Sequence, residues 1–135
     1  MKVGLLIITH DHIGSSLLDT AINMMGVCPL AVDCISVTSG CDPDGLNELA
    51  RKKVSMVNQG AGVIVLTDMY GSTPSNIATN IESAYEDVVV ITGLNLPMLV
   101  RLLNYPHLTL DQLTGKAISG GRDSIFLCKS DVAEA

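Results

Sequence analysis

The sequence predicts an α/β fold: a doubly wound, mainly parallel β-sheet with helices on both of its faces. Near-continuous apolar runs without polar alternation indicate strands buried on both sides, and they cover residues 3–9, 63–67 and 88–92. Residues 32–37 predict a further strand. Segments with apolar residues at helical spacing separate these runs. Because the connections are short, the repeated strand–helix units with right-handed crossovers place the strands parallel.

The first predicted helix presents one apolar face, which consists of Leu17, Leu18, Ala21, Met24 and Met25. Gly26 provides its stop. The second helix begins with Asp42 as its N-cap and Pro43 at its first position, an arrangement that favours helix initiation. Its buried face consists of Leu46, Leu49, Ala50, Val54 and Val57. Gly60 and Gly62 are expected to end the helix.

Pro74 opens the third predicted helix, whose apolar side consists of Ile77, Ala78, Ile81, Ala84 and Tyr85. A short helix then runs through Met98, Leu99, Leu102 and Leu103. Within Asn95-Leu96-Pro97, the proline either opens that helix or shapes the rim of a crevice. Thr109 and Gln112 predict a capping box at the start of the last helix. Residues 125–127 predict a short final strand.

Composition limits the possible functions. The chain has 135 residues without a low-complexity tract, so we expect residues 1–135 to form one domain,. A net charge of −6 with only 8 scattered Lys and Arg residues argues against nucleic acid as a partner,. No signal peptide and no apolar stretch of about 20 residues is present. We therefore expect a soluble, cytoplasmic protein without direct membrane insertion.

The 4 cysteines form no C-x-x-C pair. In a cytoplasmic protein such residues are expected to be small, reduced, buried side chains, and we assign them no chemistry.

Two residues that can carry chemistry follow two of the predicted strands. His10 comes directly after the run at residues 3–9, and Asp68 comes directly after residues 63–67. In open α/β sheets ligands bind at the carboxyl ends of the strands, where the crossovers reverse side. Alone, each residue also fits a structural role, as a cap or a loop histidine. Together, they predict one site in which the carboxylate orients the imidazole and leaves the other ring nitrogen as a nucleophile.

A loop of small residues follows Asp68 and leads into a predicted helix. Backbone N–H groups at a helix start bind anions, and glycine lets the backbone approach closely. Gly71, Ser72 and Thr73 are the candidate phosphate-binding residues, because Pro74 has no N–H to donate; a simple helix cap is the alternative for Ser72 and Thr73. With His10 and Asp68, this loop suggests phosphoryl transfer to the imidazole.

Three segments carry a resemblance to a known family: Thr9-His10, the run from Leu66 to Asn76, and the run from Gly93 to Leu99. They resemble the mannose-type IIA domains of the bacterial phosphoenolpyruvate-dependent sugar phosphotransferase system. The resemblance implies that His10 accepts a phosphoryl group from the phosphocarrier HPr and passes it to a IIB partner, with Asp68 orienting the ring. It also implies a phosphotransferase that acts in sugar uptake or regulation as a homodimer, with residues 125–127 pairing across to the partner and no metal or organic cofactor.

The chain departs from this family in the loop after His10. Many members have glycine there, whereas this chain has Asp11 and then His12. Because a carboxylate beside the phosphoryl group would repel it, we expect Asp11 to point to solvent. His12 is the second candidate for the phosphoryl acceptor. We expect no fused IIB domain, so the expected acceptor is a separate protein, or is absent in a purely regulatory module.

Three other functions are compatible with parts of the pattern. A phosphotransfer subunit of dihydroxyacetone kinase would use the same histidine chemistry with a different acceptor. A flavodoxin-like ligand-binding module would use the loop from Thr9 to Ser16 for a cofactor phosphate, but the chain offers few aromatic walls for a flavin. A receiver domain would need an acidic cluster for magnesium where Thr9-His10 stands.

Overall fold

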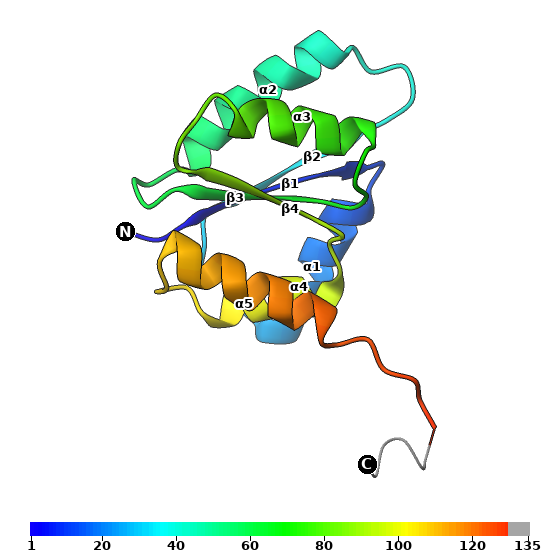
Figure 1. The fold of residues 1–135 in the computed structure, drawn as a ribbon, viewed down its shortest axis with the longest axis vertical. Coiled ribbons are helices and arrows are strands. Elements are labelled where there is room, and N and C mark those ends of the chain that lie inside the picture. The colour runs from blue at the N-terminus through cyan, green and yellow to red at the C-terminus, as the bar shows by residue number, and fades with distance from the viewer. Residues whose placement is uncertain (130–135) are drawn as a thin grey trace.

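The computed structural model describes residues 1–129, which form a parallel sheet between two helical layers (Figure 1). In chain order the elements are β1 (Gly4–His10), α1 (Ile13–Met25), β2 (Val32–Val37), α2 (Pro43–Val57), β3 (Val63–Thr67), α3 (Thr73–Glu82), β4 (Val88–Thr92), α4 (Leu96–Asn104) and α5 (Leu110–Arg122). Strands and helices alternate as far as β4, as the apolar runs predict. The predicted α/β fold class is therefore confirmed.

The sheet has the order β2-β1-β3-β4, and all of its strand pairs are parallel. From β1 the chain moves outward to β2 and then returns across β1 to β3 and β4. The direction of winding therefore reverses between β1 and β3, and a crevice is expected where the carboxyl ends of these two strands diverge. The register pairs Ile8 with Thr67, and Thr67 with Thr92.

Each face of the sheet is covered by its own helical layer. In Figure 1, α2 and α3 lie on one face, and α1, α4 and α5 lie on the other. Side chains of a strand alternate between these layers: Leu5 and Ile7 pack into the cluster of α1, α4 and α5, whereas Leu6 and Ile8 pack into the cluster of α2 and α3. Each of these four side chains is buried, and each contributes about 1.5–3 kcal/mol of transfer free energy to folding.

Local signals at the helix ends act as predicted. Gly26 ends α1 in the left-handed conformation with φ 77°, and Asp42 caps α2 by accepting from the N–H groups of Asp44 and Gly45. Thr109 and Gln112 form the full capping box of α5. Asn95 accepts from the N–H of Met98 with Pro97 in the first turn of α4, so this segment opens a helix.

Three expectations about the elements are wrong. Helix α2 ends at Val57, with Asn58 as its cap, and the two glycines lie in the turn beyond it. Helix α3 ends at Glu82, which leaves Ala84 exposed and outside the helix, and Tyr85 half-buried beyond it. Met24 and Leu49 are largely exposed on their helices.

Residues 125–127 form no strand in the described chain, and Ile125, Phe126 and Leu127 are exposed. A strand requires a neighbouring strand for its backbone hydrogen bonds, and within residues 1–129 this segment extends away from the sheet (Figure 1). The prediction of a final strand is therefore not met within a single chain.

Across residues 1–129, no helix combines the length and the apolar character that a membrane crossing requires.

Candidate functional site

His10 and Asp68 meet at the carboxyl ends of β1 and β3. The Nδ1 atom of His10 lies 2.8 Å from Oδ2 of Asp68, and the backbone N–H of His10 donates to the same oxygen at 3.1 Å. Asp68 therefore holds both the main chain and the ring of the histidine. The side chain of His10 is 42% exposed and that of Asp68 is 12% exposed, so the ring is accessible while the group that orients it is sheltered.

The hydrogen bond assigns the tautomer of His10. An ionised carboxylate only accepts hydrogen bonds, so Nδ1 carries the proton and Nε2 keeps its lone pair. Burial raises the pKa of Asp68, but the hydrogen bonds from the ring and the backbone of His10 outweigh it and hold this pKa below its ordinary value. Asp68 is therefore ionised at neutral pH. In the neutral ring, the geometry therefore presents Nε2 as the nitrogen with a lone pair, on a side chain that is partly exposed.

The loop after Asp68 ends at the start of α3. Gly71 has φ 78°, in the left-handed region that favours glycine,. The hydroxyl of Ser72 donates to the carbonyl of Met69 at 2.6 Å and does not cap the helix, although Ser72 occupies the N-cap position. Within residues 1–129, no acceptor contacts the backbone N–H of Ser72 or of Thr73. These N–H groups and the dipole of α3 can bind an anion.

The three predicted phosphate-binding residues thus differ in what they offer. The N–H of Gly71 points to the hydroxyl of Ser75 at 3.4 Å, a long contact that an anion can displace. Ser72 offers its backbone N–H, because its hydroxyl is already engaged. Thr73 is the first residue of α3 and offers its N–H as well.

Thr9 holds the loop that follows β1, a role that the sequence pattern alone did not reveal. Its hydroxyl accepts from the N–H of Gly14 at 2.8 Å and donates to the carbonyl of His10 at 3.2 Å. Gly14 allows this close approach, since a Cβ at this position would lie 2.6 Å from Cγ2 of Ile7. A buried threonine followed five residues later by a glycine in a helix is the signal that identifies such an anchor.

Asp11 and His12 lie outside the pair formed by His10 and Asp68. Asp11 is exposed, as expected, and has φ 43°, and its N–H donates to the carbonyl of Val37. His12 is exposed at the N-cap position of α1 and makes no side-chain cap. In the described chain, the hydrogen bonds that the Asp68 carboxylate accepts from other residues come from His10.

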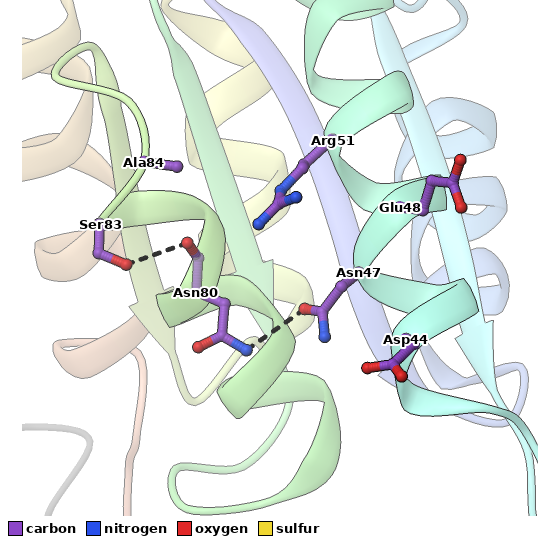
Figure 2. Close-up of a pocket in the computed structure, with 7 residues that line it drawn as sticks. All are labelled: Asp44, Asn47, Glu48, Arg51, Asn80, Ser83 and Ala84. Carbon is purple, nitrogen blue, oxygen red and sulfur yellow. Dashed lines mark hydrogen bonds between the residues drawn. The ribbon is translucent and has the colours of Figure 1, made fainter.

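A polar hollow of about 680 Å³ lies elsewhere, between α2 and α3. Figure 2 shows Asn47 hydrogen-bonded to Asn80 across it, with Arg51 extending toward Asn80 and Ala84. A smaller hollow of about 200 Å³ lies at the carboxyl end of β4, lined by residues that include Thr92, Asn95 and Arg122. Neither contains His10 or Asp68.

The cysteines are free thiols. Burial and the neighbouring Asp33 carboxylate raise the pKa of Cys34 to about 11, which keeps this thiol protonated. In residues 1–129, no three His, Cys, Asp or Glu side chains are grouped so that they could hold a metal ion.

Comparisons with known proteins found a matching family, relatives of similar sequence and solved structures of similar fold. The model of a family described as the PTS system fructose IIA component matches residues 4–115. The PTS system mannose-specific EIIAB component of Escherichia coli (strain K12) is 29% identical over 136 residues, which cover 99% of this chain and 42% of that protein. The chain thus spans less than half the length of this curated relative.

Solved structures share the architecture. The mannose/sorbose specific IIA subunit of the phosphotransferase system from Enterococcus faecalis has a TM-score of 0.85 at 22% identity, covering 96% of each chain. The PTS IIA protein associated with the fucose utilization operon from Streptococcus pneumoniae has a TM-score of 0.78 at 26% identity, covering 94% of this chain and 93% of that one. These structures therefore share the overall fold of this chain.

Proposed function

The chain belongs to the family of PTS system fructose IIA components, and on this premise we propose that it is a histidine phosphocarrier of a sugar phosphotransferase system. His10 accepts a phosphoryl group from an HPr-type phosphocarrier and passes it to a IIB protein. Residues 1–135 act as one IIA domain in the cytoplasm. The observation that carries the proposal is the contact of 2.8 Å between Nδ1 of His10 and Asp68, which leaves Nε2 as the nucleophile.

The transfer step follows from this arrangement. The lone pair of Nε2 attacks phosphorus, and the bond between phosphorus and the donor nitrogen breaks with its electron pair returning to the donor imidazole. His10 keeps its proton on Nδ1, so its ring gains positive charge as the new bond forms. The Asp68 carboxylate stabilises that charge without taking the proton. Transfer to the IIB protein reverses these steps.

The start of α3 supplies the complementary binding site for the phosphoryl oxygens. The free N–H groups of Ser72 and Thr73 sit at the positive end of the helix dipole, and Gly71 leaves room beside them. Backbone donors of this kind are fixed before the reaction, so they stabilise charge without a reorganisation cost. No metal or organic cofactor is needed for this step.

The surface around His10 supports a protein as donor and acceptor. Met69 and Tyr70 directly follow Asp68 and are 60% and 81% exposed, and Ile13, close to His10 in the chain, is also exposed. Large exposed apolar side chains beside a reactive group are typical of protein-interaction surfaces. These three residues are proposed to contact the partner proteins.

The exposed residues 125–127 support the proposed homodimer. Ile125, Phe126 and Leu127 present apolar side chains to solvent in the single chain, and β4 is an edge strand of the sheet. An edge strand can pair with a strand from another chain. We therefore propose that these residues pair across to a partner protomer.

Intact-mass analysis tests the phosphocarrier. The wild type, His10→Ala, His12→Ala and Asp68→Ala are incubated with phosphoenolpyruvate, enzyme I and HPr. The expected result is one acid-labile phosphoryl group on the wild type and on His12→Ala, none on His10→Ala, and slow labelling of Asp68→Ala. Label that persists in His10→Ala, or an unlabelled wild type, would contradict the proposal.

A further inference from the structure

Buried polar side chains are rare in this protein and gather beside the candidate site. In the described chain they are Thr9, Thr67 and Ser75, which are 1%, 0% and 2% exposed. Thr9 precedes His10, Thr67 precedes Asp68, and Ser75 lies in the first turn of α3. The concentration of buried hydroxyls at one edge of the sheet indicates a role there.

Two of these hydroxyls have structural partners and the third has none. Thr9 contacts Gly14 and His10, and Ser75 accepts from Gly71. Within residues 1–129, Oγ1 of Thr67 has no hydrogen-bond partner. Leaving a buried hydroxyl unpaired is unfavourable, and native proteins rarely do so without a reason. Valine has the same shape without the hydroxyl, so packing alone does not account for threonine at this position.

The alternation of β3 shows which way the Thr67 side chain faces. Val63 and Val65 pack into the cluster with Ile77 and Ala78 of α3, and Thr67 follows them at the same period of two. Its side chain therefore lies on the face that α3 covers. The start of α3 presents the free N–H groups of Ser72 and Thr73 at this same edge of the sheet.

His10 belongs to the same face of the sheet. Leu6 and Ile8 of β1 pack into the cluster of α2 and α3, and His10 is the next residue in that alternation. Because Ile8 lies opposite Thr67 in the register, His10 stands two residues beyond Thr67 toward the carboxyl edge. Thr67, the start of α3 and His10 thus lie on the same face and at the same edge of the sheet.

We propose that Thr67 is a phosphoryl-binding residue, whose hydroxyl donates a hydrogen bond to an oxygen of the phosphoryl group on Nε2 of His10. This inference rests on the proposed function and adds a side-chain donor to the backbone donors of α3. Removing the hydroxyl should therefore affect the free and the phosphorylated protein differently. The free protein tolerates the removal because its hydroxyl is unpaired, whereas the phosphorylated protein loses a hydrogen bond and becomes less stable.

Phosphoramidate provides a test that needs no partner protein. Its P–N bond breaks, a P–N bond forms to Nε2 of His10, and ammonia leaves. The wild type, Thr67→Val, Thr67→Ser and Thr92→Val are labelled, and the site and extent are measured by mass spectrometry. Urea unfolding of the free and phosphorylated forms then gives the effect of phosphorylation on the unfolding equilibrium constant. Thr92 lies opposite Thr67 on β4, so Thr92→Val is the matched control.

The expected result separates binding from a structural role. Free Thr67→Val unfolds at the same urea concentration as the wild type or a higher one. Phosphorylation lowers the unfolding equilibrium constant of Thr67→Val less than it lowers that of the wild type. The two reductions differ by a factor on the order of ten, which is the effect of a hydrogen bond to a charged group. Thr67→Ser restores the wild-type effect, and Thr92→Val matches the wild type.

Two results would overturn the inference alone, with the wild type labelled on His10. One is an equal effect of phosphorylation in the wild type and Thr67→Val. The other is a loss of stability in free Thr67→Val as large as that in its phosphorylated form, which would assign Thr67 a structural role. A wild type that takes no label on His10 would instead contradict the proposed function.

Discussion

A single oxygen of Asp68 accepts two hydrogen bonds from His10, one from the ring at 2.8 Å and one from the main chain at 3.1 Å. The ring is therefore aligned relative to its own backbone as well as to β3. An amide oxygen would accept similar hydrogen bonds, but only the charged carboxylate stabilises a positively charged ring.

Asp68→Asn is predicted to keep the fold and lose most of the transfer rate. The amide can retain the contacts of 2.8 Å and 3.1 Å but not the charge, so we expect phosphoryl uptake from HPr to slow by about 10²-fold or more. Rapid-quench mass analysis measures this rate. Asp11→Asn is the matched control, because it removes an exposed carboxylate next to His10 and is expected to leave the rate within a few-fold of the wild type. Equal slowing of both variants would contradict the role of Asp68.

The lowered pKa of Asp68 predicts a pH-dependent contribution to stability. A carboxyl whose pKa is lower in the folded state than in the unfolded state stabilises the fold above its unfolded pKa of about 3.9. That contribution is lost as the pH falls through the lowered pKa of the folded state. Urea unfolding of the wild type and Asp68→Asn should therefore differ at pH 7, and the difference should begin to shrink below about pH 4. A difference that persists unchanged at pH 3 would contradict this assignment.

Gly14 in α1 and Gly115 in α5 form a matched pair of helical glycines, one tightly packed and one with open space beside it. An added Cβ at Gly14 would lie 2.6 Å from Cγ2 of Ile7 and 2.9 Å from Oγ1 of Thr9, whereas Gly115 in α5 has nothing within 4 Å. Gly14→Ala is expected to destabilise the protein by about 1–3 kcal/mol. Gly115→Ala is expected to stabilise it by about 0.5–1 kcal/mol through helix propensity. Denaturant unfolding measures both, and a stable Gly14→Ala would show that α1 can move away from β1.

The left-handed backbone of Asp11 predicts that glycine is better tolerated there than alanine. With φ 43°, a residue with a Cβ is strained by about 1–2 kcal/mol, and the polar side chain of aspartate relieves only part of this. Asp11→Gly should therefore be more stable than Asp11→Ala by about 1 kcal/mol. Urea unfolding at neutral pH compares the two variants, which carry the same charge. Equal stability would place the strain elsewhere in the loop.

Much of the framework can be predicted from the sequence because its signals are local. The strand ends at Val37 and Thr67 follow from apolar runs, and the caps at Asp42 and Thr109 follow from side chains that reach their own backbone. His10 and Asp68 can be paired in advance because parallel strands present their carboxyl ends at one edge. Their contact is the part of the site that topology alone predicts.

Other features depend on what surrounds a residue and could not be predicted. Ala84 continues the helical period of α3 but lies beyond its end, because periodicity does not report where a chain turns. The hydroxyl of Ser72 bonds to the carbonyl of Met69, a choice set by the shape of the loop. The Thr67 hydroxyl has no hydrogen-bond partner among the described residues, and this depends on the three-dimensional positions of all its neighbours.

The reversal of winding between β1 and β3 also affects the order of folding events. His10 and Asp68 are 58 residues apart in the chain, with all of α1, β2 and α2 between them. The helices can form early from local contacts, whereas the pairing of β1 with β3 must wait for the closure of this long loop. A refolding chain therefore acquires the contact between His10 and Asp68 only when its central strands have joined, and recovery of the proposed phosphoryl uptake would time that late step.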